Sequence, residues 1–281
     1  MSIRAAIDLI RPVNCAMIGF AVIVGVFVSK PPSVQPLQSV LGFLTGFFVC
    51  AYSMAVNDIY DVEVDRVNRP GRPIPSGRLT VQSSFRVSLV VLIAGVACSA
   101  LSLSPLAVGI ALVYALLSWL YNTKAKKTGF AGNLIVASSL AIPFIYGGVI
   151  SGGSITMSLL LMMALTSFFS GVGREVVKAM ADVEGDAKRG IESVARKNGL
   201  RAASIVGAVF FLLAVLTSWV PLLTGLANWV YSYGVLVPDA IFIGLAALTI
   251  LRPDPASAYR VKRVALAGMT IGLVVFVGGA L

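Results

Sequence analysis

Residues 57–65 have the sequence NDIYDVEVD and lie where a long apolar stretch ends. If this segment is helical, Asn57, Asp61 and Asp65 share one face, because a helix completes a turn in about 3.6 residues. Carboxylates packed this closely repel one another unless a cation neutralises them, and Mg2+ prefers oxygen ligands together with phosphate. The segment therefore predicts a helix end that holds Mg2+, with Asp58 in an intermediate position.

A second charged cluster occupies residues 174–186. Asp182 and Asp186 are again four residues apart, and Arg174 and Lys178 precede them at the same interval. On one helix these side chains form a ladder, in which the cations bind phosphate and the carboxylates hold Mg2+. The alternative is an ion pair between Lys178 and Asp182, which stabilises a helix by only about 0.2–0.5 kcal/mol. Two such clusters that face each other bracket a diphosphate.

The composition is that of a membrane protein. Hydrophobic residues make up 58% of the chain and charged residues 12%, whereas a soluble domain has about 25% charged residues; the mean hydropathy is +0.92. Nine apolar stretches approach the roughly 20 residues that cross a bilayer. They are residues 12–29, 38–56, 84–103, 105–121, 130–151, 155–174, 202–220, 229–251 and 263–281. We therefore expect an all-α, polytopic bundle of nine transmembrane helices.

No segment is long and polar enough to form a separate soluble domain, so residues 1–281 are expected to be a single membrane domain. With nine spans, Lys30 is the one Lys or Arg among twenty-two that falls on the side opposite to the acidic clusters. The positive-inside rule then places the N-terminus and both clusters in the cytoplasm and the C-terminus outside, in a multi-pass protein of the cell membrane. The net charge of +10 follows from this topology. Nucleic-acid binding is not expected, because the basic loops border a bilayer and its lipids.

The chain contains no histidine, which excludes imidazole metal sites and Ser-His or Cys-His nucleophilic pairs. Cys15, Cys50 and Cys98 lie in apolar stretches at no metal-ligand spacing, so we expect them to be packing residues. Glu63 and Glu184 fall between the spaced aspartates and are expected to point away from them.

The loop after the first cluster contains three prolines in residues 70–75, which prevent it from remaining helical. We expect a stiff cap that presents arginines over the helix ends. Asn14, a polar residue inside the first apolar stretch, is a further site candidate. Asp239 follows Pro238 and is left out of the predicted site.

The strings NDIYDVEVDRVNRPGRPIPSGRL and REVVKAMADVEGD resemble the motifs of the UbiA superfamily of intramembrane prenyltransferases, and the resemblance extends over the whole chain. It implies a helical bundle around a central cavity, with a cytoplasmic cap. It also implies transfer of a prenyl group from an isoprenyl diphosphate donor, with Mg2+ as the cofactor. By motif position, the metal ligands are Asp61, Asp65, Asp182 and Asp186, with Asn57 and Asp58 supporting catalysis. The residues assigned to substrate binding are Asn14, Arg66, Arg72, Lys124, Arg174 and Lys178.

The RPIPSG sequence at residues 72–77 resembles that of chlorophyll synthases and of the archaeal ether-lipid enzymes more than that of quinone-pathway enzymes. Asn14 in the RPVN sequence, the short loops and the DVEGD form at residues 182–186 favour the archaeal ether-lipid branch of this superfamily. Its acceptor is a lipid phosphate, geranylgeranylglyceryl phosphate, whose hydroxyl receives a geranylgeranyl group. The surplus of cations agrees with an acceptor that carries a phosphate. Chlorophyll-synthase-like and quinone-pathway aromatic prenyltransferases, with other lipophilic acceptors, are the alternatives. The quinone-type Y-x-x-x-K spacing is not reproduced after Tyr121, which leaves the role of residues 121–127 open.

The sequence argues against two other classes of membrane protein. A transporter or lipid-binding protein usually has its polar site near the bilayer midplane, whereas these carboxylates lie at the ends of apolar stretches. CDP-alcohol phosphotransferases also place aspartates at a membrane face, but their D-G-x-x-A-R core does not occur here.

Overall fold

A computed structural model describes residues 2–29, 36–154 and 158–280. Within these ranges every helix or strand assigned is a helix, which confirms the all-α prediction. The elements are α1 (Ile3–Ile10), α2 (Pro12–Val28), α3 (Pro36–Tyr60), α4 (Val62–Asn68), α5 (Val81–Leu101), α6 (Pro105–Thr123), η1 (Ala125–Thr128), α7 (Phe130–Ser151), α8 (Ser158–Met180), α9 (Val183–Lys188), α10 (Val194–Leu223), α11 (Trp229–Gly234), α12 (Leu236–Leu251) and α13 (Pro255–Ala280).

The described residues contain eight spans long and apolar enough to cross a membrane, one of which joins α11 and α12. The helices α1 and α2, bent by 50° at Arg11, form a ninth span when they are counted together. The protein is thus a multi-pass membrane protein, and the predicted order of nine apolar stretches is confirmed.

The chain divides into two compact units. The first unit contains Met1–Thr123 and Tyr146–Ser154, and the second contains Lys124–Ile145 and Ile155–Leu281. Helix α7 passes from the second unit into the first. Each unit carries one acidic cluster, the first after α3 and the second after α8.

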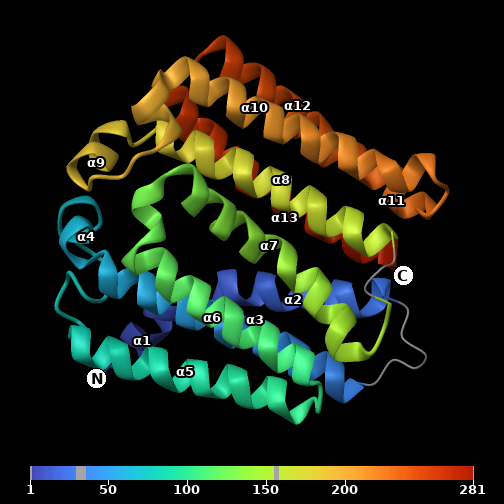
Figure 1. Cartoon of the computed structure of the whole chain (residues 1–281), viewed down its shortest axis with the longest axis horizontal. Coiled ribbons are helices and arrows are strands. Elements are labelled where there is room, and N and C mark those ends of the chain that lie inside the picture. Colours follow the sequence, from blue (N-terminus) through green and yellow to red (C-terminus); the bar gives the residue numbers. More distant parts are fainter. Residues whose placement is uncertain (1, 30–35, 155–157, 281) are drawn as a thin grey trace. The chain divides into compact units, whose positions relative to one another are not determined.

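In the first unit α3 packs against α2, α5 and α6 (Figure 1). Small residues permit the closest approaches. A Cβ atom at Gly147 of α7 would lie 2.2 Å from the carbonyl oxygen of Val22 in α2, so these helices meet backbone to backbone. Close contact through small residues is a common means of packing helices in a bilayer, where lipid supplies no hydrophobic drive between them.

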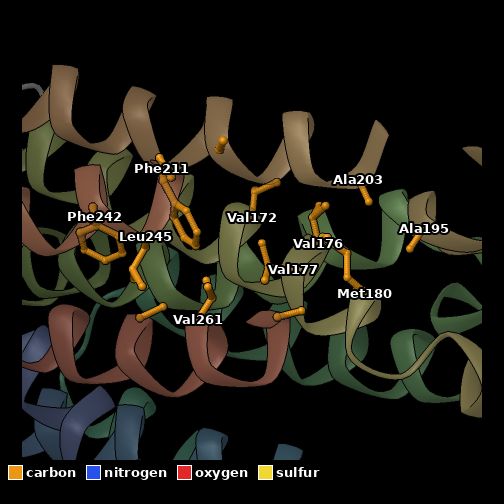
Figure 2. Close-up of a cluster of buried hydrophobic side chains, with 14 of the residues drawn as sticks. Val172, Val176, Val177, Met180, Ala195, Ala203, Phe211, Phe242, Leu245 and Val261 are labelled. Carbon is orange, nitrogen blue, oxygen red and sulfur yellow. The ribbon is translucent and has the colours of Figure 1, made fainter. Parts of the chain in front are cut away.

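In the second unit α8 packs against α10 and α13, and α12 packs against α10 and α13. Figure 2 shows the buried cluster that joins them, which includes Val172 and Val176 of α8, Phe211 of α10 and Phe242 of α12, with Val172 beside Phe211. Ala181 and Val183, in the segment that follows α8, also pack against this core.

The acidic segments differ from the continuous helices that the spacing predicts. Helix α3 ends at Tyr60 and α4 begins at Val62, with Asp61 as the N-cap of α4. Likewise α8 ends at Met180, and Asp182 is the N-cap of α9, with φ −134° and ψ 36°. Aspartate favours the N-cap position, where the backbone leaves the helical region and negative charge meets the positive end of the helix dipole.

The four-residue spacing survives both breaks. The amide of Asp65 donates to the carbonyl of Asp61 (2.8 Å), and the amide of Asp186 donates to the carbonyl of Asp182 (2.8 Å). The predicted ladder from Arg174 to Asp186 is wrong at Asp182, because the Asp182 amide donates to Ala179, three residues back, and not to Lys178.

Candidate active site

Asp58 and Asp65 lie at the centre of the first cluster, and they are 2% and 5% exposed. Arg72 donates to Asp58 (3.0 Å) and forms an ion pair with Asp65, while Arg11 forms an ion pair with Asp58. Removing carboxylates from water costs free energy that is recovered only through such paired cations. Two arginines from separate segments thus hold two buried carboxylates.

The proline-rich loop brings Arg72 to this position. Its turns are closed by backbone bonds from Ser76 to Arg72 (3.0 Å) and from Leu79 to Pro73 (2.9 Å). Ile74 and Leu79 pack against α1 in a small buried cluster, which anchors the loop. The predicted cap is therefore present within the first unit.

Other members of the predicted first site lie differently. Arg66 is exposed and pairs with Glu63 at 2.9 Å on the surface, so neither side chain joins the buried carboxylates. Asn57 donates to Asn122 at the end of α6 (2.9 Å). Asp61 is partly exposed at the start of α4.

Two predicted substrate contacts are surface residues. Asn14 is exposed on α2, and Lys124 is exposed just before η1. The backbone amide of Asn14 donates to the carbonyl of Arg11 (3.0 Å), and the side chain of Arg11 pairs with Asp58.

In the second cluster Arg189 binds both aspartates, at 2.5 Å from Asp182 and 2.8 Å from Asp186. Asp186 is 6% exposed. Burial raises the pKa of the Asp186 carboxyl, although the nearby Arg189 acts in the opposite direction. A bound cation would therefore stabilise the charged form of the Asp186 carboxyl.

Arg174 and Lys178 do not extend a ladder to Asp182. Both pair with Glu175: Arg174 Nη1 lies 2.9 Å from one carboxylate oxygen, and Lys178 forms an ion pair with the other. Glu175 is 3% exposed. Lys178 therefore pairs with Glu175, and not with Asp182 as the alternative interpretation of the sequence predicted.

Three charged residues of these clusters were not predicted from the sequence: Arg11, Glu175 and Arg189. Arg11 precedes the first apolar stretch and Arg189 follows the second acidic cluster, and neither arginine belongs to a motif. Glu175 had a usable signal, because it is the single acid in residues 66–181 and lies three residues before Lys178 in an apolar stretch.

The donor set fits Mg2+ bound jointly with phosphate. No group of three or more His, Cys, Asp or Glu side chains converges within the described residues. Mg2+ is nonetheless commonly bound through one or two carboxylates plus substrate phosphates, and not by a cage of protein ligands. Each cluster offers a buried aspartate with a second aspartate four residues away, which meets that requirement.

An all-helical membrane bundle whose two aspartate clusters follow membrane helices defines a class of intramembrane enzyme. The sequence profile of the UbiA prenyltransferase family matches residues 18–273. The chain belongs to this family and is a prenyltransferase.

Curated relatives match over nearly the full length. A digeranylgeranylglyceryl phosphate synthase of Archaeoglobus fulgidus is 37% identical, over 99% of this chain and 96% of the relative. A protein of the same name from Methanocaldococcus jannaschii is 34% identical, over 99% and 97%.

Solved structures show the same fold. A structure described for digeranylgeranylglyceryl phosphate synthase superposes with a TM-score of 0.80 at 33% identity, and covers 99% of this chain and 98% of that one. A UbiA homologue from Archaeoglobus fulgidus bound to GPP and Mg2+ gives a TM-score of 0.64 at 18% identity, with 97% and 99% covered.

Proposed function

We propose that this protein transfers a geranylgeranyl group from geranylgeranyl diphosphate to the free hydroxyl of geranylgeranylglyceryl phosphate in membrane ether-lipid synthesis. The observation that carries this proposal is the full-length similarity to digeranylgeranylglyceryl phosphate synthases, at 37% and 34% identity. The donor and the metal are supported by the related structure bound to GPP and Mg2+.

In this proposal Asp61, Asp65, Asp182 and Asp186 bind Mg2+ for the reaction, and Asn57 supports the first pair. Mg2+, when bound, offsets the negative charge of the leaving diphosphate. Asp58 is held by two arginines, so its role is to orient Arg72 and not to bind metal. Arg72, Arg174, Lys178 and Lys124 contribute positive charge for the phosphate groups.

The reaction breaks the bond between the allylic carbon and the diphosphate oxygen and forms an ether bond to the acceptor hydroxyl, whose proton is released. Stabilisation of developing charge supplies most of such catalysis, so a histidine base is not required. The apolar helices exclude water that would otherwise capture the allylic cation.

We further propose that the clusters and the N-terminus are cytoplasmic and that both compact units belong to one catalytic domain. Each unit supplies one aspartate cluster, and the family match at residues 18–273 includes both. The positive-inside rule supports the orientation.

The test is an assay of purified protein with Mg2+, radiolabelled geranylgeranyl diphosphate and a panel of acceptors. We expect label in digeranylgeranylglyceryl phosphate and none after addition of EDTA. Transfer to chlorophyllide or 4-hydroxybenzoate, with none to geranylgeranylglyceryl phosphate, would contradict the proposed acceptor.

A further inference from the structure

Glu175 is a buried acid on α8 that the aspartate motifs do not include. Its side chain is 3% exposed, and its neighbours Val172 and Val176 belong to the apolar core of the second unit. A buried carboxylate costs several kcal/mol unless cations and hydrogen bonds compensate it. An apolar residue at this position would avoid that cost, so the presence of the acid calls for a functional reason.

Glu175 is compensated by more positive charge than it needs. Arg174 binds one of its oxygens at 2.9 Å and Lys178 binds the other. Lys126, from the loop before α7, lies close enough to add a third attraction. The acid faces the core, whereas the side chains of Arg174 and Lys178 are 24% and 43% exposed. The group therefore presents a net positive charge at its exposed side.

The Arg174 guanidinium retains unused donor capacity. Its Nε atom is buried and has no hydrogen-bond acceptor among the described residues, although buried donors in folded proteins are nearly always paired. Lys178 is also near enough to Asp186 to attract its carboxylate. Lys178 thus lies beside a predicted Mg2+ ligand, where a phosphate group that shares the metal would be.

We propose that Glu175 is a positioning residue whose carboxylate holds Arg174 and Lys178 together as a cationic pair that binds a phosphate group of the substrates. The inference rests on the proposed function for its substrates and extends it to a residue outside the motifs. A purely structural acid would require one cation for neutrality. Two cations that reach the surface, one with an unpaired donor, fit an anion whose source is the donor diphosphate or the acceptor phosphate.

The first test compares Glu175→Gln with the unaltered protein. Glutamine keeps the shape and accepts hydrogen bonds, but it removes the charge that fixes the two cations. We expect KM for one substrate to rise about tenfold or more, with a smaller change in kcat, because the substrate loses part of its charge-assisted hydrogen bonding to the two cations. A rise for geranylgeranyl diphosphate alone assigns the pair to the donor, and a rise for geranylgeranylglyceryl phosphate alone assigns it to the acceptor phosphate.

Binding of inorganic pyrophosphate with Mg2+, measured by titration calorimetry, gives a readout that does not depend on the acceptor. We expect weaker binding if the pair serves the diphosphate. Glu184→Gln is the matched control, because Glu184 is an exposed acid on the following helix, α9, and we expect it to leave both readouts unchanged. Failure of the proposed function would appear as no transfer by the unaltered protein, which is distinct from a failure of this inference.

The double variant Glu175→Gln/Lys178→Gln tests whether Glu175 acts through Lys178. If it does, the second substitution adds less than its own effect, because coupled residues are not additive. Unchanged KM values for both substrates in Glu175→Gln, or fully additive effects, would overturn the proposal. If Glu175→Gln does not fold, the single variant Lys178→Gln tests the proposal, because Lys178 is partly exposed. Unchanged KM values for both substrates in Lys178→Gln would then overturn the proposal.

Discussion

At the scale of single residues, both clusters share one electrostatic arrangement. A buried aspartate is paired with an arginine from outside its own motif, Arg72 for Asp65 and Arg189 for Asp186. Removing one partner of a buried ion pair costs about 3–5 kcal/mol. These arginines therefore have a structural task in addition to any contact with phosphate, which the motif spacing alone does not indicate.

We expect Asp65→Asn and Asp186→Asn to lower Mg2+-dependent turnover by about a hundredfold or more, because each removes a charge that stabilises the metal without a change in volume. Steady-state assays over a Mg2+ titration measure this, and thermal unfolding checks the fold. Glu63→Gln and Glu184→Gln are the controls, since both acids are exposed. Equal damage in the controls would show that the assignment of the aspartates is wrong.

At the scale of helices, Gly147 and Asp239 each hold two helices together. Gly147 brings α7 against the backbone of α2. Asp239, which is not part of the predicted site, is 5% exposed at the start of α12. It accepts hydrogen bonds from Ser218 (2.9 Å) and from the indole nitrogen of Trp219 (2.8 Å) in α10. Asp239 therefore links α10 to α12 in the second unit.

Gly147→Ala is expected to lower the melting temperature of the detergent-solubilised protein. The added methyl carbon would lie 2.2 Å from the Val22 carbonyl oxygen and 2.6 Å from the Val26 nitrogen, so α2 and α7 must separate. Overpacking of this kind costs about 1–3 kcal/mol. Gly109→Ala is the matched control on α6, because nothing lies within 4 Å of its new methyl group. A melting temperature as high for Gly147→Ala as for Gly109→Ala would contradict the close contact.

Asp239→Leu is expected to destabilise the second unit by about 1–3 kcal/mol, because it leaves the Ser218 and Trp219 donors without their acceptor. Asp239→Asn, which retains an acceptor oxygen, should lose less. Thermal unfolding ranks the two variants. If Asp239 has a packing role alone, both variants keep the KM values of the unaltered protein at a temperature where they are folded. A change in KM would assign Asp239 to substrate binding instead.

At the scale of the whole molecule, charge asymmetry predicts the orientation in the membrane. The loop between α10 and α11 contains no Lys or Arg, whereas residues 124–127 contain three lysines. Moving such basic loops across a bilayer is disfavoured, which is the basis of the positive-inside rule. The loop after α10 should therefore lie outside the cell and the loop before α7 in the cytoplasm.

Single cysteines introduced at these loops test the orientation. We expect Leu226→Cys, at a position that is 42% exposed, to react in intact cells with a membrane-impermeant maleimide. Lys127→Cys, which is also exposed, should react only after the membrane is opened. The unaltered chain, with its three cysteines in helices, is the control for background labelling. Labelling of Lys127→Cys in intact cells would reverse the proposed topology.

The sequence by itself determined the helical membrane fold, the order of the spans and the position of both aspartate motifs. These are local properties: apolar length decides which stretches cross a bilayer, and the spacing of Asp61 and Asp65 is preserved even where the helix breaks between Tyr60 and Val62. Site residues with no motif, such as Arg11 and Arg189, were missed because hydropathy and spacing do not indicate which charged side chains come into contact in the folded chain.

Only the tertiary structure decided those pairings. Arg11 and Arg72 reach Asp58 from segments 47 and 14 residues away in the chain, and Asp239 meets Ser218 across two helices. The free energy of a buried charge depends on the partner that folding brings to it and not on its neighbours in sequence. For that reason Lys178 pairs with buried Glu175 and not with Asp182.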